Sequence, residues 1–275
     1  MGKLTAVILA AGKGTRMKSK LPKALHKVGG RPMLEHVMDA AEAAGCRDNV
    51  VIIGHGAGLV RTLVGNRARI ALQAEQLGTG HAVLQAAEAL KDFVGTVMIL
   101  CGDTPLIEGA ELKKLYEFHV QSGAAATVMT AMLEDPFGYG RILRNADGDV
   151  AGIVEEKEAS PEQKQIKEIN TGNYCVETPL LFEVLETLGR KDEHSEYYLT
   201  DLVALLRARG EKVSGFLTND SEMIMGVNSP EQLAVAEEIM QRRILEKSVT
   251  PAAEKLAAIG KLAAGGVAAG ENEEN

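Results

Sequence analysis

Cysteine is scarce in this chain, and long apolar runs are missing. The three cysteines, Cys46, Cys101 and Cys175, lie far apart and form no CxxC pair, so the sequence predicts neither a disulfide framework nor a zinc site. The apolar run AVILAA near the N-terminus is too short for the core of a signal peptide and far too short to span a bilayer. We therefore expect a cytoplasmic protein that does not enter a membrane.

An excess of positive charge is also missing. Lys and Arg total 30 against 38 Asp and Glu, which gives a net charge of −8 and argues against general binding of nucleic acid or acidic membranes. With 275 residues, 45% of them hydrophobic, the chain can bury a sizeable core. The histidines show no metal-ligand spacing, and we expect each to be structural or on the surface. They are His26, His36, His55, His81, His119 and His194.

Strand-like runs alternate with helical patterns in the first half of the sequence. This alternation predicts an α/β fold of the Rossmann-like, three-layer kind, in which helices cover both faces of a mostly parallel sheet. The expected strands are 4–10, 49–54, 68–73 and 95–103, and the expected helices are 33–45, 57–65, 80–91 and 109–121.

The pattern changes after residue 122. Residues 124–132, 138–156 and 169–177 predict further strands, and a turn at Asp147-Gly148 joins two of them. A turn of this kind connects antiparallel strands. The sequence therefore predicts an antiparallel excursion that covers a substrate.

A helix start follows at Ser229, with Pro230 at the first helical position and Gln232 at the capping-box position. The helix is expected to continue to about Lys247. The remaining chain is rich in Ala and Gly and ends in acidic residues, which predicts a partly helical and then disordered tail. The expected units are a main domain over 1–228, a helix over 229–247 and a tail over 248–275.

A glycine-rich basic loop follows the first strand, in LAAGKGTRMKSKLPK. Where a parallel strand ends, backbone N–H groups of such a turn can face a phosphate, and nearby cations neutralise its charge. The loop is not a P-loop, and Met17 stands where the dinucleotide fingerprint needs its third glycine. A solvated basic turn is the alternative. The candidates for phosphate contact are Gly12, Lys13, Gly14, Arg16, Lys18, Lys20 and Lys23.

Two further stretches carry polar groups toward a site. In MILCGDTPLI an apolar strand runs into Gly102 and Asp103, and a carboxylate at a strand end can hold a divalent cation against phosphate oxygens. The alternative role of Asp103 is to cap the next turn. In QAEQLGTGHA, residues 73–82, side-chain amides precede a helix and can read the edge of a nucleobase, although this signal is weak alone.

Several stretches occur together in a fixed order over about residues 4–245. They are LAAGKGTRMKSKLPK, QAEQLGTGHA, CGDTPLI, DPFGYGRI, GIVEEKEAS, EINTGNY, SEYYLTD and GVNS. Together they resemble the uridyltransferase half of the bifunctional N-acetylglucosamine-1-phosphate uridyltransferase/glucosamine-1-phosphate acetyltransferase family. The first stretch is shared by many sugar nucleotidyltransferases, whereas the glutamine block with GYGRI and EINTG is more selective. The resemblance implies a nucleotidyltransferase fold for 1–228 and a sugar-binding role for the antiparallel excursion.

The same resemblance implies where the nucleotide binds. Uridine and phosphates are implied to follow one set of residues, with Gln73, Gly78 and Thr79 at the uracil ring. The set is Leu9, Ala10, Ala11, Gly12, Gly14, Gln73, Gly78, Thr79, Cys101 and Gly102. Arg16 and Lys23 are implied to be the catalytic cations at the phosphates.

Residues for the metal and the sugar follow in the same way. Asp103 and Asn228 are implied to hold Mg²⁺, the expected cofactor. The acetamido sugar is implied to lie against Gly140, Glu155, Asn170 and Asn228, with Tyr198 and Thr200 as weaker candidates. Glu156 is expected to belong to a solvated charge run.

The implied reaction is in-line transfer of uridylyl from UTP to N-acetylglucosamine 1-phosphate. It gives UDP-N-acetylglucosamine, a cell wall precursor, and pyrophosphate without a covalent intermediate. Other hypotheses stay open: dTTP as the nucleotide, glucose or galactose 1-phosphate as the sugar, or a nucleotide-sugar sensor without turnover.

Two features depart from the family pattern. Cys101 stands where many members have an aromatic residue, so we expect ligand contact there through the backbone only. Residues 248–275 cannot build the β-helix of the acetyltransferase half, so we expect no acetyl transfer. Because that half builds most of the family's trimer, the sequence does not predict an oligomeric state.

Overall fold

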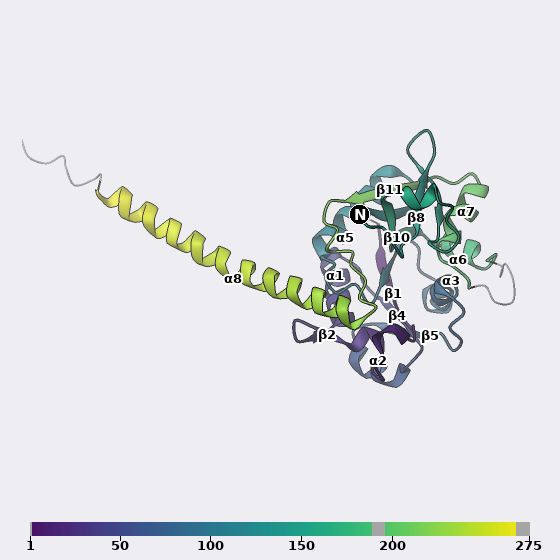
Figure 1. The fold of residues 1–275 in the computed structure, drawn as a ribbon, viewed down its shortest axis with the longest axis horizontal. Helices are drawn as coiled ribbons and strands as arrows, with labels where there is room; N and C mark the ends of the chain where they lie inside the picture. The colour runs from purple at the N-terminus through teal and green to yellow at the C-terminus, as the bar shows by residue number, and fades with distance from the viewer. Residues whose placement is uncertain (1, 189–195, 268–275) are drawn as a thin grey trace, which may run out of the picture.

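The computed structural model describes residues 2–188 and 196–267, of which 249–267 are given by their helical backbone alone. Within this part of the chain, a nine-stranded mixed sheet has helices on both faces (Figure 1). The predicted Rossmann-like, three-layer α/β fold is confirmed. His194 and the end of the predicted tail, 268–275, lie outside the described residues.

The centre of the sheet is β1 (Leu4–Ala10), which pairs in parallel with β4 (Val50–Ile53) and β6 (Thr96–Cys101) on its two sides. Outside β4 lies β5 (Arg69–Leu72), also parallel. The chain thus moves from β1 outward through β4 and β5 and then returns to the other side of β1 at β6. This reversal is a topological switch point, where open α/β sheets bind their ligands beyond the carboxyl ends of the strands.

The other half of the sheet contains the antiparallel strands. There β10 (Glu168–Glu177) runs antiparallel between β6 and β7 (Ala126–Met132). A hairpin of β8 (Arg141–Arg144) and β9 (Val150–Val154) joins β10 through β8, so the predicted antiparallel excursion is confirmed. The edge strand β11 (Val213–Thr218), parallel to β7, was not predicted.

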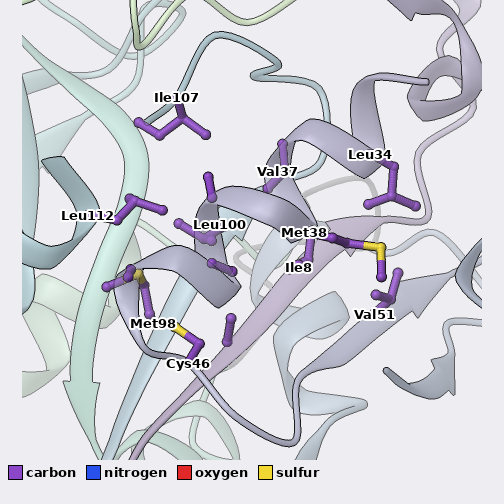
Figure 2. Packing of buried hydrophobic residues seen from close by; sticks show 14 of the residues in the cluster. Ile8, Leu34, Val37, Met38, Cys46, Val51, Met98, Leu100, Ile107 and Leu112 are labelled. Carbon is purple, nitrogen blue, oxygen red and sulfur yellow. The ribbon is translucent and has the colours of Figure 1, made fainter. Parts of the chain in front are cut away.

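Seven helices of the described chain cover the two faces of the sheet. One face packs against α1 (Met33–Ala44), α2 (Ala57–Val64) and α5 (Gly109–Ser122), and the other against α3 (Thr79–Leu84), α4 (Ala87–Leu90), α6 (Leu180–Leu185) and α7 (Asp201–Ala208). Successive side chains of a strand point to opposite faces. Ile8 of β1 accordingly lies beneath α1, against Leu34 and Val37 (Figure 2), whereas Val7 faces the second set of helices.

Smaller elements connect the layers. A short two-stranded sheet is formed by β2 (Lys27–Val28) and β3 (Arg31–Pro32), and the described residues include three 3₁₀ turns. These turns are η1 (Thr15–Met17), η2 (Lys23–Leu25) and η3 (Gln163–Gln165).

The helix predicted over 80–91 is wrong as a single element. It is divided into α3 and α4, because Gln85 and Ala86 donate to the carbonyl oxygens of Ala82 and Val83 in tight i to i−3 bonds. The buried face of both pieces nevertheless packs on the sheet, as expected for a helix with apolar residues on one side.

The last helix, α8 (Pro230–Val267), begins where the sequence predicts and extends further. Ser229 Oγ accepts from Gln232 N–H at 3.3 Å, which confirms the N-cap. The predicted end near Lys247 is wrong, since residues 252–264 are mostly Ala, Leu and Lys, which are strong helix formers. After its first turns pack against the body, α8 projects away from the sheet (Figure 1). Across the described chain, no helix combines the length and apolarity that crossing a membrane requires.

A buried histidine connects α5 to the sheet. His119 is 2% exposed, and its Nε2 donates to Glu177 Oε1 at 3.0 Å while Nδ1 accepts from Thr127 Oγ1 at 2.9 Å. Burial lowers the pKa of the imidazole, although the hydrogen bond to Glu177 opposes this shift. The folded protein therefore keeps His119 neutral at a pH where the unfolded chain binds a proton.

We predict that His119 makes the stability depend on pH. Its folded pKa lies below the ordinary value of 6.5. The free energy of unfolding therefore falls as the pH drops below that value, by at most about 1.4 kcal/mol per pH unit from this residue, until the folded pKa is passed. His119→Gln removes this contribution. In urea unfolding, the difference between the two proteins should be smaller at about pH 5.5 than at about pH 7.5, and equal differences would contradict the prediction.

Candidate active site

A cavity of about 500 Å³ opens at the switch point between β1 and β6. Gly102 N–H donates to the Leu9 carbonyl oxygen at 3.0 Å, so the loops that follow the two strands lie side by side. All the residues predicted to contact the nucleotide line this cavity. They are Leu9, Ala10, Ala11, Gly12, Gly14, Gln73, Gly78, Thr79, Cys101 and Gly102. The structure thus brings them together, and their contact with a nucleotide stays a prediction.

Gly14 allows the basic loop to pack closely against η2, which contains Lys23. Gly14 has φ of 60°, and a Cβ atom at this position would lie 2.7 Å from Lys23 Cβ. A side chain there would be strained and would separate the loop from η2. The absence of a side chain at Gly14 therefore lets Lys23 approach the end of β6.

The two predicted catalytic cations meet at one amide. Lys23 Nζ donates to Asp103 Oδ2 and, at 2.9 Å, to Asn228 Oδ1, which also accepts from Arg16 Nη2 at 2.9 Å. The side chains of Lys23 and Asp103 are 21% and 17% exposed, so their charges are only partly screened by water. This cluster lies at the wall of the cavity.

The other basic candidates divide into two groups. Lys13 lines the cavity, whereas Lys18 and Lys20 are exposed and take no part in its lining. The structure therefore concentrates three of the loop's cations, Lys13, Arg16 and Lys23, at or beside the cavity.

Asn228 is positioned by the start of α8. Its backbone N–H donates to Gln232 Oε1 at 2.8 Å, and the preceding Val227 N–H donates to the Asp103 carbonyl oxygen at 2.9 Å. Gln232 in turn donates its own N–H to the N-cap, Ser229. The capping pattern visible in the sequence thus fixes the position of Asn228, a site residue that is distant in the sequence from the basic loop.

The donor set at Asp103 and Asn228 fits one hard cation. One carboxylate oxygen and one amide oxygen both contact Lys23 Nζ, so they already converge on a single cationic group. Mg²⁺ is commonly bound by one or two protein oxygens together with substrate phosphates and water. No group of three or more His, Cys, Asp or Glu side chains suited to a metal occurs among the described residues. The residues therefore fit an ion shared with phosphates.

Neutral amides form another part of the cavity lining. Gln73 is 3% exposed and donates from Nε2 to the Gly78 carbonyl oxygen at 3.0 Å. Gly78 has φ of 123°, and a Cβ atom there would lie 2.5 Å from the Tyr197 carbonyl oxygen. Thr79 Oγ1 accepts from Leu199 N–H at 3.0 Å, which ties the predicted base-binding turn to the chain before α7.

Three of the four predicted sugar residues, Gly140, Glu155 and Asn170, lie in a second cluster beside the cavity, whereas Asn228 belongs to the cation cluster. Asn170 N–H donates to the Gly140 carbonyl oxygen at 2.8 Å, and Glu155 Oε1 accepts from Thr200 Oγ1 at 2.9 Å. A Cβ atom on Gly140 would lie 3.6 Å from Glu155 Oε2, so Glu155 is adjacent to Gly140 as well as to Thr200. Burial raises the pKa of Glu155. Tyr198 instead meets Gly80 of α3 through its backbone.

Cys101 lies between the cavity and this cluster. It lines the cavity, and its Sγ donates to the Gly172 carbonyl oxygen at 3.6 Å, while Gly172 N–H donates to Asn170 Oδ1 at 3.0 Å. Burial raises the pKa of the Cys101 thiol to about 12, so the thiol stays protonated and is a poor nucleophile.

Some residues beside the site were missed in the sequence. The prediction of a solvated Glu156 is wrong, because its Oε2 accepts from Arg141 Nη2 at 2.7 Å and from Gly138 N–H at 3.3 Å, and Arg141 is 2% exposed. This ion pair fixes the turn before Gly140. The motif GYGRI, which contains Gly138 and Arg141, is the sequence feature that could have indicated it. Gln76 and Glu196 also line the cavity.

Known proteins resemble this chain over most of its length. Residues 6–190 match the MobA-like NTP transferase domain. The bifunctional protein GlmU of Heliobacterium modesticaldum is 52% identical over 247 residues, which are 90% of this chain and 54% of that relative. Those of Streptococcus suis and Halalkalibacterium halodurans are 51% and 52% identical over 88% of this chain and 53% of each relative. The chain spans about half the length of these curated relatives, and the family resemblance drawn from the motifs is confirmed.

We predict that removing either cation lowers turnover without unfolding the protein. Arg16→Ala or Lys23→Ala should reduce kcat/KM for pyrophosphate release from UTP and N-acetylglucosamine 1-phosphate, the substrates that the family resemblance implies, by at least about 100-fold, the effect of losing one preorganised charge-stabilising donor. Lys20→Ala is the matched control, since Lys20 is exposed and does not line the cavity. Near-normal turnover in both site variants would show that the loop is a solvated basic turn and would contradict the site assignment.

Proposed function

Because the chain belongs to the MobA-like NTP transferase domain family, we propose that it transfers uridylyl from UTP to N-acetylglucosamine 1-phosphate and releases pyrophosphate. The main support is the meeting of Arg16, Lys23, Asp103 and Asn228 at the switch-point cavity. Similarity to bifunctional GlmU proteins over about 90% of the chain adds to it.

The proposed reaction needs positioning and positive charge and no covalent nucleophile. A phosphate oxygen of the sugar 1-phosphate attacks the α-phosphorus of UTP, a new P–O bond forms, and the bond to pyrophosphate breaks. The two substrates are anions that repel each other. Arg16 and Lys23 reduce this repulsion and stabilise the charge on the five-coordinate phosphorus. Asp103 and Asn228 would hold Mg²⁺, which would supply further positive charge to the phosphate oxygens.

The ends of the site are suited to different parts of the substrates. The buried amide of Gln73 faces the cavity near Gly78, where a base can be read by hydrogen bonds. Glu155, Asn170 and the backbone of Gly140 offer oxygen acceptors and an amide to sugar hydroxyls and the acetamido group. Cys101 separates these ends, and its small side chain leaves contact there to the backbone.

Related reactions use the same chemistry. dTTP in place of UTP, or glucose or galactose 1-phosphate as acceptor, needs the same cations and metal. A sensor without turnover is less well supported, because binding alone does not need both cations together with the oxygen pair at Asp103 and Asn228. The cytoplasmic location stays a prediction.

We predict strict pairing of substrates in a turnover panel. Each of UTP, dTTP, CTP, ATP and GTP is incubated with N-acetylglucosamine, glucose or galactose 1-phosphate, and pyrophosphate release is measured. UTP with N-acetylglucosamine 1-phosphate should give the highest kcat/KM. A different best pair would replace the substrate assignment. Binding of nucleotides without release of pyrophosphate in any pair would favour the sensor.

We also predict that turnover requires a divalent cation. Activity should be lost in EDTA and restored by Mg²⁺, and Asp103→Asn should shift half-saturation to higher Mg²⁺ by at least about tenfold, since one charged ligand is lost. Asp147→Asn is the control, because Asp147 lies in the exposed turn between β8 and β9. Full activity in EDTA would contradict the metal assignment.

A further inference from the structure

The amide of Gln73 has a fixed orientation in this structure. Its Nε2 donates to the Gly78 carbonyl oxygen at 3.0 Å, and a carbonyl oxygen can only accept. The second Nε2 hydrogen is directed at Nδ1 of His81, 3.0 Å away. Both donors of the amide are therefore engaged by the protein.

His81 accordingly acts as an acceptor at Nδ1. A neutral imidazole carries one proton, so that proton is on Nε2, the atom that lies 3.1 Å from the Gln85 amide. Gln85 Nε2 also donates to the His81 carbonyl oxygen at 3.0 Å, so a half-turn that presents the Gln85 oxygen to the proton gives up this bond. Gln85 is only partly buried and can exchange the bond for water, whereas Gln73 is 3% exposed and is held by the Gly78 carbonyl oxygen. The ring also packs against Tyr197, with the ring centroids 6.1 Å apart, so His81 is held from both sides.

This arrangement leaves one polar atom of Gln73 for a ligand. No donor among the described residues bonds Gln73 Oε1, and the side chain lines the cavity. The amide thus offers an acceptor and no donor. Uracil and thymine carry a ring N–H at their hydrogen-bonding edge, whereas cytosine carries an unprotonated ring nitrogen at the same position.

We propose that His81 is a positioning residue that keeps Gln73 an acceptor and thereby selects nucleotides whose base has a ring N–H over those of cytosine. This inference rests on the proposed function, because it takes the Gln73 end as the base site. A turned amide would offer its NH₂ group to the cavity and favour cytosine. His81 and the Gly78 carbonyl oxygen oppose that turn together.

A purely structural role for His81 makes a different prediction. If the ring only fills the space between α3 and Tyr197, its replacement lowers stability and leaves the choice of base unchanged. His119→Gln is the matched control for that outcome, because it changes a different imidazole, which is buried and lies away from the cavity.

The test compares His81→Phe, which has no acceptor, with His81→Asn, whose Oδ1 can replace Nδ1. Binding of UTP, CTP and N3-methyl-UTP with Mg²⁺ is measured by calorimetry without the sugar phosphate. In His81→Phe the preference for UTP over CTP should fall by about fivefold, the effect of one hydrogen bond, and His81→Asn should restore it. N3-methylation should weaken binding to the wild type more than to His81→Phe.

The outcomes separate this inference from the proposed function. An unchanged UTP to CTP ratio in folded His81→Phe, or equal effects of N3-methylation in both proteins, would overturn the role of His81 even if turnover is as proposed. A changed ratio with no pyrophosphate release from any substrate pair would support His81 and contradict the proposed reaction. A change in His119→Gln of the same size would also count against His81.

Discussion

The contact of Lys23 with Asp103 and Asn228 is the interaction on which the rest of the site depends. It joins the loop after β1, the end of β6 and the start of α8, which are distant in the sequence. Like charges around phosphates can be assembled only where opposite charge and amide oxygens hold them in place. The sheet, the glycine turn and the helix cap therefore position one cluster, and a defect in any of them should displace Arg16 and Lys23.

Most of the central sheet could be predicted from the sequence because its signals are local. β1, β4, β5 and β6 are short apolar runs, and alternating strands and helices imply parallel pairing. β11 escaped prediction because its sequence is mixed and its identity as a strand comes from pairing with β7. The division of 80–91 and the full length of α8 likewise depend on backbone bonding and helix propensity that apolar periodicity does not record.

The candidate site shows the same division between local and distant information. The position of Asp103 follows from a strand that ends at a switch point, and the basic loop follows from its glycines. The roles of His81 and Arg141 did not follow. His81 meets Gln73 only because Gly78 turns the chain back at positive φ, and Arg141 pairs with Glu156 only because β8 and β9 form a hairpin. A residue whose partner is set by a turn cannot be recognised from its type.

In the proposed reaction, charge and selectivity come from different residues of the cavity for a physical reason. Every nucleoside triphosphate carries the same phosphates, so Arg16 and Lys23 can accelerate transfer without telling one nucleotide from another. Discrimination requires a polar group that loses its hydrogen bond, and is left without a partner, when the wrong base enters. Gln73 meets this requirement because it is buried and neutral and because the protein has already engaged its donors. The cost of a mismatched base is then an unpaired acceptor on a buried side chain, which the cations of the cavity cannot relieve.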